Sequence, residues 1–179
     1  MPRIDFPTQA ARIMFAAAAV AGLALALAGC ADSRGPQPAF YQNLARSGGQ
    51  LDAGNALNLI NNYRQSQGVG AVSLNPALMS LAKGYAASLA GNARTNRNVQ
   101  PDGKLRARLQ SAGYQAADVD ESVTAGYHTF AEAFSGWRDS PPHRKTMLMK
   151  NATEMGIAAA YAPNTRYKVY WVLVMAQPK

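Results

Sequence analysis

The sequence predicts an α+β domain in which helices cover both faces of a small antiparallel sheet, as a three-layer α-β-α sandwich. Helical patterns fill the middle of the chain, and its C-terminal end predicts a hairpin of two strands over residues 156–161 and 167–175. Pro163 and Asn164 lie in the turn between them. The second strand is apolar on both faces, so we expect it at the centre of the sheet with helices on each side.

Two long helices are expected in the first half of the domain. The first is predicted over residues 53–67, where apolar side chains recur on one side and Gly68 can stop the helix. The second is indicated by its two ends. Asn75 can cap it, Pro76 suits the first helical position, and Gly91 can end it.

Shorter elements follow. A helix is predicted over residues 104–112 and a strand over 121–127. Thr129 and Glu132 have the spacing of a capping box, which predicts the start of another helix. The buried face of that helix is expected to carry three aromatic side chains: Phe130, Phe134 and Trp137. Ser140, followed by two prolines, predicts the cap of a last short helix.

The chain begins with the pattern of a secretory signal. Arg3 and Arg12 come before a stretch, residues 13–27, that carries no charged or polar side chain. This stretch is shorter than the roughly 20 apolar residues that a membrane-spanning helix needs. We therefore expect a signal peptide over residues 1–29 rather than a retained membrane helix.

The end of this signal, Leu27-Ala28-Gly29-Cys30, resembles the lipobox of bacterial lipoproteins. The resemblance implies cleavage before Cys30 and acylation of Cys30, with the attached lipids, palmitate among them, as a membrane anchor. Ala31 rather than Asp follows the cysteine, which favours the outer membrane, facing the periplasm or the exterior. A flexible tether is expected over residues 30–50, ahead of a domain over 51–179.

Composition excludes several classes of protein. The chain has 179 residues, of which 48% are apolar and 16% charged, so an ordinary globular domain is expected rather than disorder. Its single cysteine permits no internal disulfide, and no Gly-rich phosphate loop is present. The net charge is +8, with a concentration of basic residues over 94–108. These residues could meet anionic lipid or acidic glycan, but a solvated loop and helix face is favoured over both. No aromatic residues are interleaved there to stack bases, so nucleic acid is not expected as a partner.

Several segments resemble bacterial CAP domains, the cysteine-rich secretory protein, antigen 5 and pathogenesis-related (SCP-like) family. The most distinctive are Ser140-Pro-Pro-His-Arg144 and Asn151-Ala-Thr-Glu-Met-Gly156. The resemblance begins near residue 53, includes Asn55-Ala-Leu-Asn-Leu-Ile-Asn-Asn-Tyr-Arg64, and continues to residue 176. It implies an α-β-α sandwich with an open cleft, on which two histidines and two glutamates converge in many members.

Only half of that tetrad is present in this sequence. His143 takes the position of the second histidine, and Glu121 that of the glutamate in the family's Gly-Glu-Asn. Asn98 stands where the first histidine would be, and Ser140 where the second glutamate would be. A catalytic zinc needs three protein ligands, so a divalent metal would require a further residue. His128 could supply it only if its loop folds over the cleft, and no cofactor is expected otherwise.

Nucleophilic catalysis is a second reading of the same residues. Ser140 and His143 are three apart and could meet, although a serine before a proline favours a helix cap. A third reading is structural. His143 could bond the Glu121 carboxylate, which would raise the pKa of the histidine. Trp137 and Trp171 are expected in the core.

The sequence favours a cell-envelope lipoprotein whose CAP domain is a non-enzymatic binding module for a lipid, glycan or protein partner. The alternative is a divalent-metal-assisted or serine hydrolase that acts on envelope material. The incomplete tetrad, with Asn98 and Ser140 in two of its places, favours binding.

Overall fold

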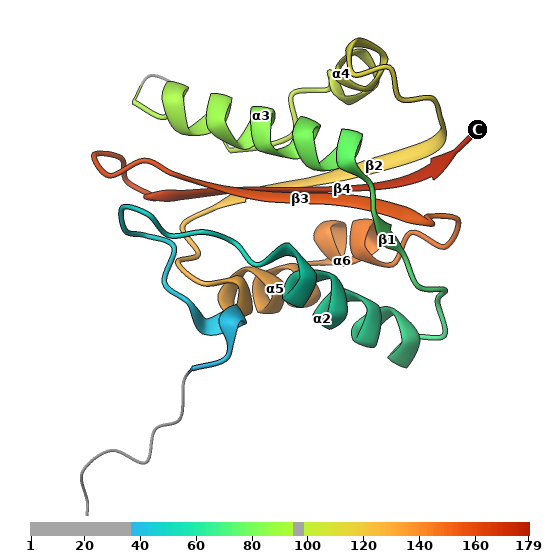
Figure 1. Cartoon of the computed structure of the whole chain (residues 1–179), viewed down its shortest axis with the longest axis horizontal. Coiled ribbons are helices and arrows are strands. Elements are labelled where there is room, and N and C mark those ends of the chain that lie inside the picture. Colours follow the sequence, from blue (N-terminus) through green and yellow to red (C-terminus); the bar gives the residue numbers. More distant parts are fainter. Residues whose placement is uncertain (1–36, 95–98) are drawn as a thin grey trace, which may run out of the picture. The chain divides into compact units, whose positions relative to one another are not determined.

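One four-stranded sheet organises the domain in the computed structural model, which describes residues 37–94 and 99–179 (Figure 1). The strands are β1 (Ser73–Leu74), β2 (Ala116–Ala125), β3 (Glu154–Tyr161) and β4 (Val169–Pro178), in the spatial order β1-β3-β4-β2. β4 pairs antiparallel with both β2 and β3, whereas β1 runs parallel to β3. The sheet is therefore mixed rather than wholly antiparallel, and β2 forms one of its edges.

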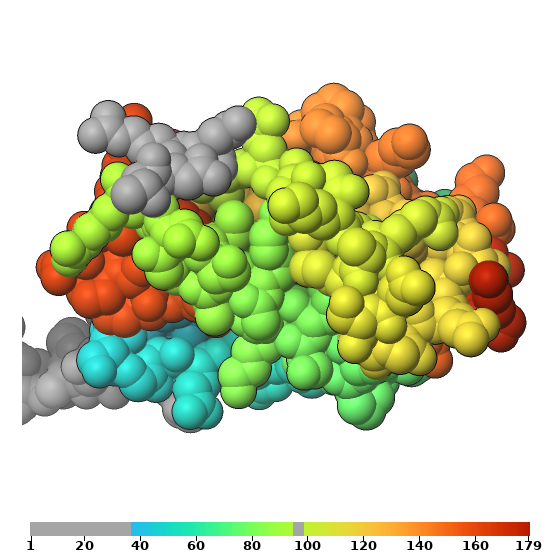
Figure 2. All heavy atoms as spheres, turned by 90° about the horizontal axis from the view of Figure 1, so that it is seen from above, coloured from blue at the N-terminus to red at the C-terminus, as the bar shows by residue number. Residues whose placement is uncertain are grey.

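Helices cover both faces of the sheet, which confirms the predicted three layers (Figure 1). On one face lie α3 (Pro76–Asn92) and α4 (Leu105–Ser111), and Figure 2 views the molecule from this side. On the other lie α2 (Ala53–Ser66), α5 (Phe130–Asp139) and α6 (Pro141–Met147), together with the short 3-10 helix η2 (Ala39–Tyr41).

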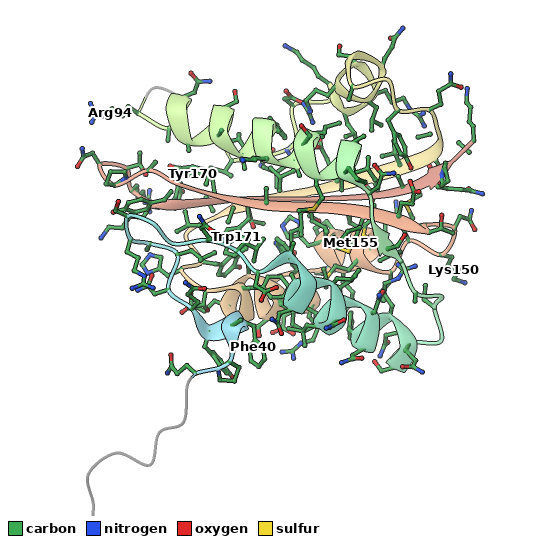
Figure 3. All side chains as sticks on the ribbon, in the orientation of Figure 1. Phe40, Arg94, Lys150, Met155, Tyr170 and Trp171 are labelled. Carbon is green, nitrogen blue, oxygen red and sulfur yellow. The ribbon has the colours of Figure 1, made fainter. Side chains whose placement is uncertain are left out.

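β4 lies at the centre of the sheet, as its apolar sequence predicts, and its residues from Val169 to Ala176 are all buried. Its side chains alternate between the two layers. Trp171, Leu173 and Met175 join the core on the side of α2 and α5, where Figure 3 shows Trp171 and Met155. The alternate residues Val172, Val174 and Ala176 pack with α3 and α4.

Two of the helix starts predicted from the sequence are confirmed in atomic detail. The side-chain oxygen of Asn75 accepts hydrogen bonds from the backbone N–H groups of Ala77 and Leu78 at the start of α3. Thr129 and Glu132 make both hydrogen bonds of the capping box at the start of α5. These side chains satisfy backbone donors that a helix otherwise leaves without partners.

α3 approaches β3 closely at Gly156. A β-carbon built on Gly156 would come within 2.2 Å of the backbone carbonyl of Leu78, so only glycine fits there. Gly84 in the same helix has open space around it and no such constraint.

The domain begins earlier than predicted. The compact unit runs from Pro38 to Lys179, and Leu44 lies in the core with 3% of its surface exposed. The N–H of Leu44 donates to the carbonyl oxygen of His128 at 2.7 Å. The tether expected over residues 30–50 is therefore wrong from Pro38 onward, because this segment supplies core contacts. Cys30 and the expected signal peptide lie outside the described residues, and no helix in the described ranges combines the length and apolarity needed to cross a membrane.

Candidate functional site

A cleft of about 750 Å³ lies along the outer edge of β2. Residues 99–101 contribute to its lining, as do Pro142 and His143 at the start of α6. Tyr127, which follows β2, and Tyr167 of the β3–β4 turn also line it. Both residues that the sequence places in the family's tetrad, Glu121 and His143, border this cleft.

Glu121 and His143 nevertheless belong to different layers of the fold. In β2, Glu121 pairs with Val174 and its neighbour Ser122 pairs with Leu173, so these two side chains point to opposite faces of the sheet. Glu121 faces α4, whereas Ser122 faces the layer that contains α6 and meets His143 there.

The carboxylate of Glu121 is held by Arg108 of α4. One guanidinium nitrogen, Nη2, donates to both oxygens of Glu121 at 2.8 and 2.7 Å, and only 4% of the Glu121 side chain is exposed. Arg108 also pairs with Asp102 and stacks over the ring of Tyr85, 3.7 Å from its centroid. Burial raises the pKa of Glu121, and Arg108 opposes that shift. Sequence reasoning noted the basic residues over 94–108 but did not connect Arg108 with Glu121.

His143 is held on the other side of β2. Its Nδ1 atom lies 3.2 Å from Oγ of Ser122, which is fully buried. Burial lowers the pKa of His143. The expectation that His143 bonds Glu121 with a raised pKa is therefore wrong. The hydroxyl of Thr146 donates to Asp120 at 3.0 Å and holds α6 against the same strand.

Ser140 occupies the N-terminal cap position of α6, as predicted, but its side chain makes no capping hydrogen bond. In the described part of the chain, no hydrogen bond joins Ser140 to His143, and the ring of His143 pairs with Ser122 instead. Ser122 has no exposed surface through which a hydroxyl could reach a substrate. Neither serine therefore forms an accessible pair with a base, the arrangement that nucleophilic catalysis requires.

The described residues do not fit a metal site. His128 is partly buried, its backbone N–H donates to the Glu132 carboxylate, and it does not line the cleft. Across residues 37–94 and 99–179, no three histidine, cysteine, aspartate or glutamate side chains are grouped so that they could hold an ion. Both oxygens of Glu121 already meet the Arg108 cation. Asn98, at the position of the family's first histidine, lies outside the described residues.

The two tryptophans lie in the core, as predicted, and both are fully buried. The indole N–H of Trp137 donates to the Thr124 hydroxyl at 3.0 Å, and that of Trp171 donates to the Tyr127 carbonyl at 2.9 Å. Thr124 and Tyr127 both line the cleft. The core therefore fixes the end of β2 and the residues that follow it.

Comparisons with known structures agree with this architecture. An extracellular protein from Bacillus anthracis that contains an SCP domain is similar at a TM-score of 0.58 and 18% identity, over 69% of this chain and 39% of that one. An outer surface protein from Borrelia burgdorferi gives a TM-score of 0.59 and 18% identity, over 73% of this chain and 98% of that one. A cysteine-rich secretory protein from Staphylococcus aureus gives a TM-score of 0.55 and 18% identity, over 69% of this chain and 37% of that one.

At these identities the structures show a shared fold, and this chain spans only about two fifths of the Bacillus and Staphylococcus proteins. No curated protein sequence matches the chain significantly. The model of the cysteine-rich secretory protein family, named CAP, matches residues 57–175. The match covers well over half of the chain and confirms the resemblance seen in the sequence. The protein belongs to the CAP family.

Proposed function

We propose that this protein is a lipid-anchored protein of the cell envelope whose CAP domain binds a ligand in the cleft along β2 without transforming it. The ligand class inferred from the sequence is a lipid, a glycan or a protein. Membrane attachment would come from acylation of Cys30.

The observation that carries the proposal is the internal pairing of both tetrad residues. Arg108 neutralises the Glu121 carboxylate, and the Nδ1 atom of His143 meets the buried Ser122 hydroxyl. General acid–base catalysis needs a group placed to exchange a proton with a substrate. Here the two candidate groups are separated by the sheet and are bonded to other side chains. They help to shape the walls of a cleft whose volume of about 750 Å³ is typical of ligand sites.

Two observations support an envelope location. The N-terminal sequence combines basic residues, a short apolar run and the lipobox-like Leu27-Ala28-Gly29-Cys30. Two structural neighbours are described as an extracellular protein and an outer surface protein. An acyl chain contributes roughly 0.8 kcal/mol for each buried methylene, so several chains on one terminus would anchor it firmly.

Native mass spectrometry tests ligand binding. The mature chain with Cys30→Ser is purified from the periplasm, and we expect a reproducible added mass that is lost in a His143→Ala variant. His128→Ala is the matched control, because His128 does not line the cleft. Thermal unfolding shows whether each variant is folded. A hydrolytic activity that disappears with His143→Ala would contradict a purely binding role.

Labelled palmitate tests the anchor. We expect incorporation into the wild-type chain and none into Cys30→Ser, since Cys30 is the single cysteine. A wild-type chain that takes up no label and does not sediment with membranes would refute the anchoring.

A further inference from the structure

We propose that His143 gives the cleft a fixed hydrogen-bond donor, the N–H group at Nε2, and that the ligand meets it with an acceptor oxygen. Ser122 is the positioning residue, because its hydroxyl decides which nitrogen of the ring carries the proton. This inference rests on the proposed function, since it specifies the chemistry of the ligand for the same cleft.

Among the described residues, the hydroxyl of Ser122 has a single group to which it can donate. Ser122 lies in β2 and is fully buried. Its Oγ atom lies 3.2 Å from Nδ1 of His143, which is its hydrogen-bond partner. A buried donor without an acceptor loses the hydrogen bonds that it makes to water in the unfolded chain. The hydroxyl therefore donates its proton, and Nδ1 accepts it.

This hydrogen bond fixes the proton of the imidazole ring. A neutral imidazole carries one proton, on either of its two nitrogens. Burial lowers the pKa of His143, so the neutral ring is favoured at neutral pH. Because Nδ1 accepts from Ser122, the ring proton lies on Nε2. The opposite arrangement, with Nδ1–H donating to Ser122, would leave a buried hydroxyl with no acceptor in the described part of the chain.

The proton on Nε2 is directed toward the cleft. The N–H bond at Nε2 points away from Nδ1 and so away from Ser122, which does not line the cleft. His143 does line it, at the start of α6. Within residues 37–94 and 99–179, Nε2 has no hydrogen-bond partner. This donor is therefore available to a ligand, and the bond to Ser122 holds the ring in place.

The charged side chains of the lining agree with an acceptor on the ligand. Both oxygens of Glu121 accept from Arg108. The two oxygens of Asp120 accept from the backbone N–H of Glu121 at 2.9 Å and from the hydroxyl of Thr146 at 3.0 Å. Lys145 lines the cleft and forms no salt bridge with any residue that the structure describes. The carboxylates thus have their donors within the fold, whereas the imidazole and the ammonium group remain free to donate.

These contacts define the kind of group that fits beside His143. A carbonyl, carboxylate or phosphate oxygen has lone pairs for the Nε2–H donor. An ammonium group has no lone pair and does not fit there. A nitrogen that already carries a proton cannot act as a general base toward the ligand, which agrees with binding without transformation.

Nitrogen NMR of the mature chain with Cys30→Ser, isotopically labelled at histidine, tests the tautomer without a ligand. At neutral pH we expect His143 in the Nε2–H form, with its Nδ1 resonance at the position of a hydrogen-bonded acceptor. Ser122→Ala removes the donor, so the Nδ1 resonance should shift toward that of an acceptor without a hydrogen bond. Ser140→Ala is the matched control, because no hydrogen bond joins Ser140 to His143 in the described ranges. Thermal unfolding checks that both variants are folded.

Two small probes test the donor in the same spectra. N,N-dimethylacetamide has an acceptor oxygen and no polar hydrogen, whereas methylammonium has donors and no lone pair. We expect the first probe to shift the Nε2 resonance of His143 and the second to leave it unchanged. His128 is the internal reference, because it does not line the cleft.

A pair of variants connects the donor with the mass that native mass spectrometry detects. His143→Gln keeps an N–H donor and should hold the occupancy of the bound mass within about twofold. His143→Met is of similar size but has no donor, and it should lower the occupancy by about tenfold.

The inference is overturned if the wild-type ring carries its proton on Nδ1, or if Ser122→Ala leaves the Nδ1 resonance unmoved. It is also overturned if the two probes act alike on Nε2, or if the two His143 variants retain the bound mass equally. Its failure is distinguishable from failure of the proposed function. A bound mass that is lost in His143→Ala, together with an Nδ1–H ring, leaves a binding module that uses other contacts. Absence of the bound mass and of the Nε2–H form removes both proposals.

Discussion

Replacing Arg64 with methionine should destabilise the fold far more than an ordinary surface substitution. Arg64 lies in the last turn of α2 and is fully buried. Its guanidinium donates to the carbonyl oxygens of Gly70, Met147, Met149 and Ala152, at 2.8, 2.7, 3.1 and 3.2 Å. All four partners are neutral backbone groups, and burial lowers the pKa of the arginine. One side chain thus joins α2 to the end of α6 and the loop after it.

The expected loss in the free energy of unfolding follows from these hydrogen bonds. Met149 keeps a donor without Arg64, because the N–H of Ala152 also reaches its carbonyl. The carbonyls of Gly70, Met147 and Ala152 lose the only donors that the described residues give them. Each buried acceptor left without a partner costs about 1–3 kcal/mol, and removal of the buried cation returns part of that cost. We expect Arg64→Met to lower the free energy of unfolding by about 3–5 kcal/mol.

Urea unfolding followed by circular dichroism measures this difference. Arg138→Met is the control, because Arg138 is exposed and its salt bridge among the described residues is to its neighbour Asp139, so the loss of stability should be small beside that of Arg64→Met. Arg64→Lys keeps the charge but provides fewer donors, so its loss of stability should lie between those of Arg64→Met and Arg138→Met. A loss below about 1 kcal/mol for Arg64→Met would refute the reasoning, because it would mean that water or other donors satisfy the carbonyls.

Three further predictions concern the two walls of the cleft and the packing of α3 against β3. Arg108→Met leaves the buried Glu121 carboxylate without its partner and should cost about 3 kcal/mol in urea unfolding, most of which returns when Glu121→Leu is added. Burial depresses the pKa of His143, so the free energy of unfolding should fall as the pH drops below about 6.5. His143→Asn should flatten this dependence of stability on pH, as measured by unfolding at several pH values. The same pH dependence in the variant and the wild type would contradict the prediction. Gly156→Ala should cost about 2–3 kcal/mol because its β-carbon meets a rigid backbone, whereas Gly84→Ala should stabilise by about 0.5–1 kcal/mol. Thermal unfolding of both glycine variants checks that contrast, and a similar loss in the two would refute it.

Local signals in the sequence predicted the starts of α3 and α5 and the central strand, whereas Gly91, expected to end α3, lies within a helix that runs to Asn92. A cap such as Asn75, or the pair Thr129 and Glu132, acts on backbone groups within three residues, so the sequence contains the whole interaction. The central position of β4 followed from its apolar residues on both faces. The family resemblance then predicted the layers and the two cleft residues.

The pairing of the site residues depends on contacts between distant segments. Arg108 and Glu121 are thirteen residues apart, and their salt bridge requires α4 to pack against β2. Arg64 meets carbonyls more than eighty residues away, which no local pattern indicates. One signal was available: in a strand, Glu121 and Ser122 must point to opposite faces, so only one of them could face His143 directly.

The division of the cleft between two layers has a consequence for how the binding surface can change. One wall carries Glu121, fixed by Arg108 of α4, and the other carries His143, fixed by Ser122 and α6. The strand edge between them is tied to the core through Trp137 and Trp171. Substitutions in one wall can therefore accumulate without repacking the other, since the sheet separates their contacts. A scaffold built in this way can acquire new specificities one wall at a time, while the edge that both walls flank keeps its geometry.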